Sequence, residues 1–267
     1  MKVLKNTKSK NKITNDIKTK EINIKTKDSK QNISKEKKMS YSENSGNQFL
    51  SKVYLWMFIG LLLTAVASFG VLSSPSLMSF FIESGLFYIL IFVELAIVIL
   101  LSWRIKSMSS STATLAFIFY SVISGITLTP ILFFYTESSI FLVFLTTSGM
   151  FIGMSLFGYF TKKDLSGIGR FLIMALIGLV IAMILNIILY MIAPETAILV
   201  SFGLSVVAVL IFAGLTAYDT QNIKKIGQTI DHNDPFAQNL AIIGALKLYL
   251  DFVNLFIHLL KLFGKRR

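Results

Sequence analysis

Apolar residues dominate the chain from about position 53 to its end, in runs separated by short polar stretches. Each run is about 20 residues long, which is the length that a helix needs to cross the hydrocarbon core of a bilayer. A soluble domain would instead show helices with one apolar and one polar face. Helices also satisfy their own backbone hydrogen bonds in lipid. The pattern therefore predicts an all-α polytopic membrane protein.

Seven runs are long enough to be membrane spans, and we expect them to form a seven-transmembrane-helix bundle. The predicted spans are Val53–Leu72, Leu86–Trp103, Thr112–Phe134, Ser139–Phe160, Gly169–Ile192, Ala197–Tyr218 and Asn239–Phe263.

The first part of the chain, residues 1–48, differs in composition and contains few large apolar residues. It is rich in Lys, Asn, Ser and Thr, so it cannot bury enough apolar surface to fold alone. We interpret it as a disordered cytoplasmic tail, followed by a membrane domain over residues 49–267. A second translation start at Met39 would remove most of this tail.

The formal net charge of +12 reflects where the basic residues lie. Half of the 26 Lys and Arg residues fall in the first 40 positions, and most of the others lie in loops or at the C-terminus. A lysine-rich tail of this kind is attracted to anionic lipid headgroups. The expected partner is therefore the lipid bilayer, and no nucleic-acid partner is expected.

The loops between the spans alternate in charge, which predicts their sides of the membrane. Basic residues mark the loops after spans two, four and six, whereas the loops after spans one, three and five carry Glu and no Lys or Arg. Basic loops stay on the cytoplasmic side, so this multi-pass cell-membrane protein is predicted to have a cytoplasmic N-terminus. A full crossing by the seventh span would put the basic residues 265–267 outside. We nevertheless favour a full crossing over a re-entrant segment.

Motifs of known enzyme chemistry are missing from the sequence. It contains no cysteine, only two histidines far apart, and no zinc-protease, serine-hydrolase or P-loop motif. We therefore expect no enzyme activity, no bound metal and no other cofactor.

Two aspartates, Asp219 and Asp251, lie within or at the edge of the last two spans. A carboxylate in such a place is costly, so it is paired, protonated or in contact with water. Asp219 closes the sixth predicted span and Asp251 lies about halfway along the seventh, so the two could approach one another. Two nearby carboxylates can share one proton, which would make the pair a pH sensor. The alternative is that each forms a structural hydrogen bond between helices.

Asp251 belongs to a polar stripe on the seventh span, together with Lys247, Asn254 and His258. Spacings of three and four residues put all four on one face of a helix. Such a face would not point into lipid, so the seventh span is predicted to be a central helix surrounded by the other six. Lys247 could pair with Asp251 along the helix or extend toward the cytoplasmic surface, and we favour the second. It is also a candidate latch for the aspartates.

Glu94 is a third acid inside an apolar run, in the second span. It is a candidate gate or ion-pathway residue, and a structural role is equally consistent with the sequence. Pro130 predicts a kink in the third span, where Thr127 and Thr129 could bond the freed carbonyls. Before the seventh span, His232 lies in an acidic turn that could attract divalent cations but lacks the oxygen spacing of an EF-hand.

The segments FAGLTAYDTQNIK and ALKLYLDFVNLFIHLLKLFG contain the two aspartates, and SGITLTPI, GMSLFGYFTKKDLSGIG and ALIGLVIAMILNIIL precede them. In this order they resemble the Bax inhibitor 1 family, also called the transmembrane Bax-inhibitor-motif family, and its bacterial members in particular. The resemblance extends from about Lys52 to Gly264 and leaves out only the tail.

The resemblance implies a seven-helix fold with a central last helix and, for some members, a pH-sensitive calcium leak. It implies a di-aspartyl pH sensor at Asp219 and Asp251, and it matches the acid of the second helix to Glu94. Some members have a second-helix arginine that latches the aspartates; Arg104 is the nearest candidate here, and Lys106 competes for that place. Other bacterial members resemble modulators of a membrane-bound protease, and animal members resemble suppressors of cell death.

We therefore predict a pH-sensitive cation (calcium) leak channel gated by Asp219 and Asp251, with Glu94, Asn254 and His258 along the ion pathway. Protonation of the pair should favour the closed state. Calcium prefers six to eight oxygen ligands, more than these residues supply, so it is expected here as a permeant ion rather than a bound cofactor. The alternative is a non-transporting regulator that binds a membrane-bound protease or other membrane proteins, and a proton-coupled transporter comes third. The oligomeric state stays open.

Overall fold

A computed structural model of the chain describes residues 43–104, 107–231 and 235–267. The predicted tail up to residue 42, and with it the start at Met39, lies outside the described residues. Residues 46–267 form one compact unit. Within the described ranges the chain is helical apart from short connections and one isolated β-bridge, which confirms the all-α prediction.

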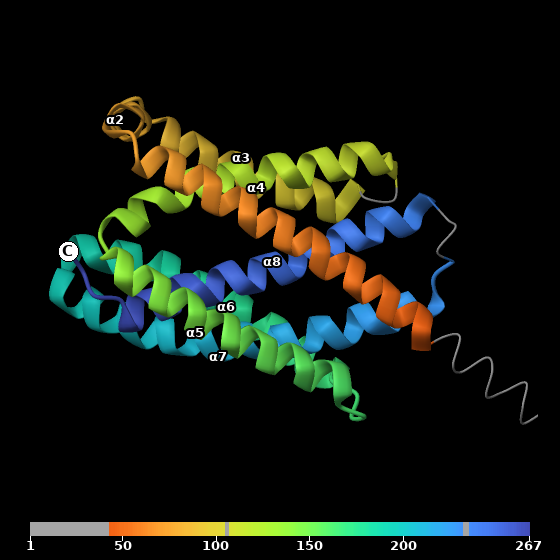
Figure 1. Cartoon of the computed structure of the whole chain (residues 1–267). Coiled ribbons are helices and arrows are strands. Elements are labelled where there is room, and N and C mark those ends of the chain that lie inside the picture. Colours follow the sequence, from red (N-terminus) through yellow and green to blue (C-terminus); the bar gives the residue numbers. More distant parts are fainter. Residues whose placement is uncertain (1–42, 105–106, 232–234) are drawn as a thin grey trace, which may run out of the picture. The chain divides into compact units, whose positions relative to one another are not determined.

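Seven helices in the described part of the chain are long and apolar enough to cross a membrane, as predicted, and a short eighth one, α2, connects the first two (Figure 1). Their bounds are Glu43–Leu72 for the first helix, Pro75–Glu83 for α2, Leu86–Arg104 for α3, Ser110–Phe133 for α4, Glu137–Phe160 for α5, Ser166–Ile192 for α6, Pro194–Thr229 for α7 and Pro235–Phe263 for α8.

Two differences from the predicted bounds lie near the start of the bundle. Residues 43–48, which composition assigned to the tail, already belong to the first helix. The helix α2 was not predicted because its nine residues are too few for a span. Pro75 stands at its first position, where a missing N–H costs nothing, and the Ser74 hydroxyl accepts a hydrogen bond from the Leu77 N–H at 3.4 Å.

The largest difference concerns α7, which continues to Thr229 although its apolar run ends at Tyr218. Polar residues such as Gln and Lys end the hydrophobic run but not the helix, because their helix propensity is high. At 1.5 Å per residue α7 is about 54 Å long, which exceeds the roughly 40–45 Å of a bilayer with its headgroups. Asp219 therefore lies inside a continuous helix, which runs past the predicted end of the sixth span at Tyr218.

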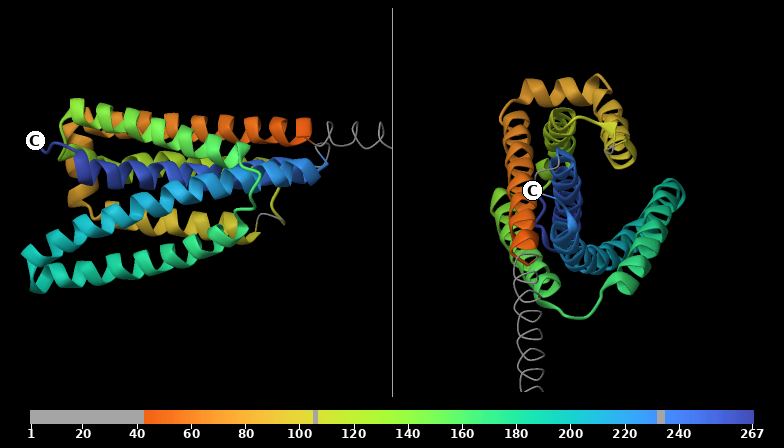
Figure 2. Two further views of the ribbon diagram at one scale, coloured as in Figure 1. Left: turned by 90° about the horizontal axis from the view of Figure 1, so that it is seen from below. Right: turned by 90° about the vertical axis from the view of Figure 1, so that its right-hand side faces the viewer.

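The last helix, α8, is central and is the most buried of the seven, as predicted. It packs against α4, α5 and α7, and at Gly244 it contacts Val53 of the first helix. Tyr249 is fully buried and meets the rings of Phe117 and Tyr120 edge to face. The prediction that all six other spans surround α8 was too broad, because α3 packs mainly on α4 and α6 packs mainly on α7. The end-on view of Figure 2 shows this arrangement.

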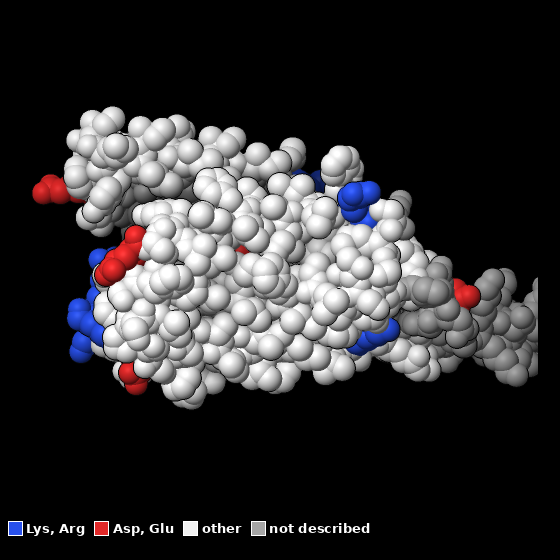
Figure 3. Space-filling view, turned by 90° about the horizontal axis from the view of Figure 1, so that it is seen from above, with Lys and Arg blue, Asp and Glu red and all other residues white. Residues whose placement is uncertain are grey.

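Connections of opposite charge lie at opposite ends of the bundle. The helix α2, the α6–α7 turn and the C-terminus lie at one end, and the α5–α6 connection and the end of α3 lie at the other (Figure 2, left). The first end carries Glu83, Glu137 and Glu195 together with the basic C-terminal residues 265–267, and the second carries Lys162 and Lys163 beside Asp164. On the face shown in Figure 3, charge is gathered at the two ends, with a largely uncharged band between them.

The helix α8 runs through to the end that carries Glu137, and the last residues of the chain pair with the α4–α5 connection there. The Thr136 N–H donates to the Lys265 carbonyl at 3.0 Å, and the Arg267 N–H donates to the Phe134 carbonyl at 2.9 Å. The Arg267 guanidinium lies 3.3 Å from the Glu137 carboxylate. This course agrees with a full crossing by the seventh span and not with a re-entrant segment.

Two glycines bring neighbouring helices close to α7 beside Asp219. A Cβ atom on Gly158 of α5 would overlap the carbonyl oxygen of Ala217, and one on Gly169 of α6 would overlap the ring of Tyr218. Small residues of this kind let helix backbones approach in a membrane. As a result, α5 and α6 both contact α7 directly before Asp219.

Candidate functional site

The candidate site lies between α7 and α8, which pack against each other as antiparallel neighbours. Asp219 on α7 and Asp251 on α8 are both buried, with 8% and 4% of their surface exposed. Before Asp219 on α7, Ala213 and Ala217 are buried, and Ala217 lies against Gly158 of α5. The structure therefore places both predicted sensor residues inside the bundle rather than toward lipid.

Lys247 links the two helices. Its Nζ atom lies 3.8 Å from Oδ1 of Asp219, and its side chain is about half exposed, at 48%. The distance is that of an ion pair and is too long for a hydrogen bond. Within the described residues Lys247 forms no ion pair with Asp251, and it lies between the helices, where a latch for the aspartates would lie. Lys247 sits one turn before Asp251, but its ammonium pairs with the acid on the other helix.

Asp251 is the less satisfied of the two acids. Its Oδ2 atom is buried and has no hydrogen-bond partner within the described residues. Asp219 and Lys247 are both close enough to act on Asp251 electrostatically. Two carboxylates and one ammonium carry one excess negative charge when all three are ionised. A single proton on either carboxylate neutralises the cluster, so the arrangement can respond to pH by gaining or losing one proton.

Asn254 and His258 continue the polar stripe of α8 but are held separately. The Asn254 amide donates to the Leu250 carbonyl of its own helix at 2.8 Å. The His258 ring lies 3.3 Å from the Ser205 hydroxyl on α7 and stacks on Phe212. Because Lys247 and His258 both contact α7, the stripe faces that helix; the spacing predicted one shared face but not the helix that it meets. Within the described residues no hydrogen bond connects either side chain to the aspartates.

Glu94 lies in a second polar cluster, built by α3, α4, α8 and the first helix. It accepts a hydrogen bond from the Thr127 hydroxyl at 3.0 Å, and Tyr249 of α8 is within its electrostatic reach. The Tyr249 hydroxyl in turn lies 2.7 Å from the hydroxyl of Thr64. Thr127 thus bonds an acid on α3 in addition to the Ser124 carbonyl of its own helix.

The remaining predicted residues do not join the aspartates. Arg104 is exposed at the end of α3 and forms no ion pair within the described ranges. Lys106 and His232 lie outside the described residues. Of the three candidate latch residues, only Lys247 is therefore placed beside an aspartate.

Two residues that follow Asp219 were not assigned a role from the sequence. The hydroxyl of Thr220 lies 3.3 Å from that of Tyr54 and 3.4 Å from that of Ser155. Gln221 accepts from the Leu165 N–H at 2.9 Å and donates to the Lys163 carbonyl at 2.8 Å.

These contacts fix the helix turn that carries Asp219 to the first helix, to α5 and to the α5–α6 connection. The signal in the sequence was the unbroken polar run from Asp219 to Asn222 next to an apolar span.

Seven apolar helices with an acidic cluster buried between the last two define a multi-pass helical membrane protein. Residues 46–267 match the family model described as "Inhibitor of apoptosis-promoting Bax1", so the chain belongs to the Bax inhibitor family.

Similar proteins are found in several bacteria. The inner membrane protein YbhL of Escherichia coli (strain K12) is 44% identical over 221 residues, covering 82% of this chain and 92% of that protein. An uncharacterized protein of Borreliella burgdorferi is 38% identical over 222 residues, covering 83% and 93% of the two chains. A third, from Rickettsia prowazekii, is 36% identical over 220 residues, covering 82% and 90%. The family model confirms the resemblance to the Bax inhibitor family, and the description of YbhL as an inner membrane protein agrees with the seven apolar helices.

Proposed function

We propose that the protein is a pH-sensitive cation leak, with calcium as a permeant ion, gated by Asp219 and Asp251. The observation that carries the proposal is the burial of both carboxylates on adjacent helices, with Asp251 Oδ2 lacking a hydrogen-bond partner among the described residues. An intramembrane acid in this condition is costly and by default marks a functional site.

Gating follows from the charge of the cluster. With one proton on the pair, the Lys247 ammonium balances the remaining carboxylate, and α7 and α8 stay together. When the proton leaves, one negative charge is uncompensated in a low-dielectric interior, and repulsion favours separation of the helices and entry of water. Acid therefore closes the leak and alkali opens it. In this proposal Lys247 takes the latch role for which Arg104 and Lys106 were also candidates.

Calcium passes through such a site without being stored there. A tight calcium cage needs six to eight oxygen ligands, and the two aspartates with a few carbonyls supply fewer. Asn254 and His258 continue the polar stripe toward the other end of α8. Glu94 lies in a separate polar cluster with Thr127 and Tyr249. We place these three along the ion pathway.

Orientation is part of the proposal. The end with Lys162 and Lys163 faces the cytoplasm together with the N-terminus, because basic connections stay inside. The chain contains no cysteine, so a single cysteine reports one position cleanly. In intact cells, a membrane-impermeant maleimide should label Ser138→Cys and not Lys163→Cys, and the reverse pattern would overturn the orientation.

The gating test uses purified protein in liposomes that contain a calcium-sensitive dye. Wild type should take up calcium faster at pH 8 than at pH 6. Asp219→Asn and Asp251→Asn should each abolish most of this pH dependence, because neither amide titrates. The matched control is Asp164→Asn, the same change at an exposed acid outside the spans. If both intramembrane variants keep the wild-type pH profile, the sensor assignment is wrong.

The alternative function, a non-transporting regulator of a membrane-bound protease or other membrane proteins, is decided by the same preparation. If the liposomes show no calcium flux at any pH and a stable partner is recovered from native membranes, the leak is refuted and the regulator takes its place.

A further inference from the structure

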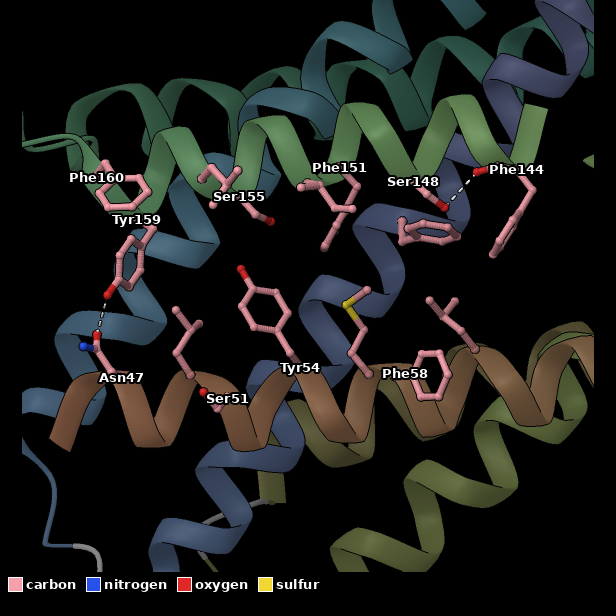
Figure 4. Close-up of a pocket in the computed structure, with 16 residues that line it drawn as sticks. Asn47, Ser51, Tyr54, Phe58, Phe144, Ser148, Phe151, Ser155, Tyr159 and Phe160 are labelled. Carbon is pink, nitrogen blue, oxygen red and sulfur yellow. Dashed lines mark hydrogen bonds between the residues drawn. The ribbon is translucent and has the colours of Figure 1, made fainter. Parts of the chain in front are cut away.

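A crevice separates the first helix from α5 and has α8 as its floor. Its larger part is a groove of about 710 Å³. Figure 4 shows side chains of the first helix and of α5 facing each other across it. Phe252 of α8 closes the bottom of the groove. The volume falls within the range of roughly 300–1,000 Å³ that is usual for small-molecule sites.

The two ends of this groove differ in polarity. At the inner end, Phe58 and Phe144 make an apolar wall. At the other end the Tyr159 hydroxyl donates to the Asn47 amide oxygen at 2.9 Å across the crevice (Figure 4). The Lys224 ammonium lies 3.9 Å above the Tyr159 ring.

Basic residues outnumber acids near this end along the chain. Lys52 is exposed on the first helix, and Lys162 and Lys163 follow the end of α5; the acids there are Glu43, one turn before Asn47, and Asp164, which pairs with Lys225. No Asp or Glu is among the described residues that line the groove. An anionic group is therefore favoured at this end and has no acidic neighbour in the lining to repel it.

The length of the groove matches one leaflet. From Asn47 to Leu61 the first helix contributes lining residues over about 21 Å, at 1.5 Å per residue. Half of a hydrocarbon core is about 15 Å thick, so a lipid chain from a single leaflet, with its glycerol region, has this reach. A second groove of about 390 Å³ continues beyond Leu61 and Phe144 and has Glu137 in its lining. The acid makes that far groove unfavourable for an anionic headgroup.

We propose that the larger groove binds one anionic phospholipid of the leaflet on the Lys224 side. One acyl chain lies along Met57 and Phe151, and the headgroup lies at the Asn47–Tyr159 end beside Lys224. This proposal does not depend on ion transport. It does place a lipid against the site, since Tyr54 in the lining contacts Thr220 and Phe252 directly follows Asp251.

The test is native mass spectrometry of the full chain released from nanodiscs that contain equal amounts of phosphatidylglycerol and phosphatidylcholine. One phosphatidylglycerol should be retained in preference to phosphatidylcholine by roughly fivefold, since one lysine near the surface contributes about 1 kcal/mol toward an anionic lipid. Ser148→Trp should remove this retention, because Ser148 lines the groove and its hydroxyl donates to the Phe144 carbonyl of its own helix, so the change breaks no described contact between helices.

The matched control is Thr146→Trp, also on α5 and also bonded to its own helix, but exposed outside the lining. It should leave retention unchanged and shows that Ser148→Trp does not act through general misfolding. Lys224→Gln should reduce the preference for phosphatidylglycerol while one lipid is still retained. Equal retention of both lipids, or retention unaffected by Ser148→Trp, would mean that the lipid binds nonspecifically at the surface of the protein, and would overturn the proposal. A dimer that Ser148→Trp dissociates would overturn it in favour of a second copy in the groove.

Discussion

The ammonium of Lys247 lies 3.8 Å from the carboxylate of Asp219 on the neighbouring helix, while Asp251, one turn along the same helix as Lys247, keeps a buried oxygen that no described residue hydrogen-bonds. One cation is thus shared unequally between two acids. This unequal sharing lets the cluster respond to pH, because two carboxylates that were both balanced by cations would bind a proton less readily.

Replacing Lys247 should move the pH at which the leak opens. Lys247→Met removes the positive charge that balances the remaining carboxylate of the closed state, so one proton no longer neutralises the cluster and closure needs a second proton. We expect the midpoint of calcium uptake to fall by about one pH unit, equivalent to about 1.4 kcal/mol, because the ion pair is half exposed and partly screened. Lys163→Met, at an exposed loop position, is the control. An unchanged or higher midpoint would contradict the role of Lys247.

Glu94 offers a way to separate conduction from sensing. It lies in its own cluster with Thr127 and Tyr249. Glu94→Gln keeps an acceptor for the Thr127 hydroxyl, so the fold should persist while the charge is lost. Calcium uptake should fall severalfold at every pH with an unchanged midpoint. Uptake equal to that of wild type would make Glu94 a structural residue, and a shifted midpoint would make it part of the sensor.

The contact between α5 and α7 beside the site can be tested by adding one methyl group. Gly158→Ala should destabilise the protein by about 1–3 kcal/mol, because the new Cβ overlaps the Ala217 carbonyl and the helices must separate. Gly153→Ala is the matched control, since nothing lies within 4 Å of a Cβ there. Thermal unfolding in detergent, followed by intrinsic fluorescence, measures both. Equal unfolding temperatures for the two variants would refute this packing.

The ion pair between Asp164 and Lys225, at the end of the bundle that carries Lys162, predicts how the stability of the fold changes at acidic pH. Hydrogen bonds from Lys225 and then Ser166 lower the pKa of Asp164 to about 2. A depressed carboxyl pKa stabilises the fold at pH values above its ordinary value of 3.8, and the effect is lost as the pH falls toward 2. Lys225→Met should raise the Asp164 pKa toward 3.8, which a carboxyl carbon NMR titration in micelles measures.

Thermal unfolding checks the same pair independently. Wild type and Lys225→Met should differ slightly at pH 7 and converge as the pH is lowered toward 2, with Lys162→Met as the control. A titration curve for Asp164 that does not respond to Lys225→Met would contradict the contact.

The helices and the orientation of the polar stripe could be predicted from the sequence. The lengths of the apolar runs predicted seven spans, because a helix must be this long to cross the hydrocarbon core of a bilayer. Helical periodicity put Lys247, Asp251 and His258 on one face, and contacts with α7 at both ends of the stripe agree with it. These features depend on local geometry, which one sequence contains.

Features that depend on relations between helices could not be predicted in the same way. The extension of α7 to Thr229 was missed because the prediction followed hydropathy, and hydropathy falls where helix propensity does not. The sequence left open which aspartate Lys247 pairs with, because a flexible side chain reaches both its own helix and the next. The role of Gln221 depends on the position of the Lys163 and Leu165 backbone, which only the folded connection sets.

The pairing of the last residues with the α4–α5 connection has a practical consequence for protein engineering. Backbone hydrogen bonds join Lys265 to Thr136 and Arg267 to Phe134, so the chain end is anchored and is not a free linker. An affinity tag or fluorescent protein fused directly there would pull on the end of the central helix and could alter the helix packing under study. Fusions ahead of residue 43 avoid that anchor and are the better choice for purification.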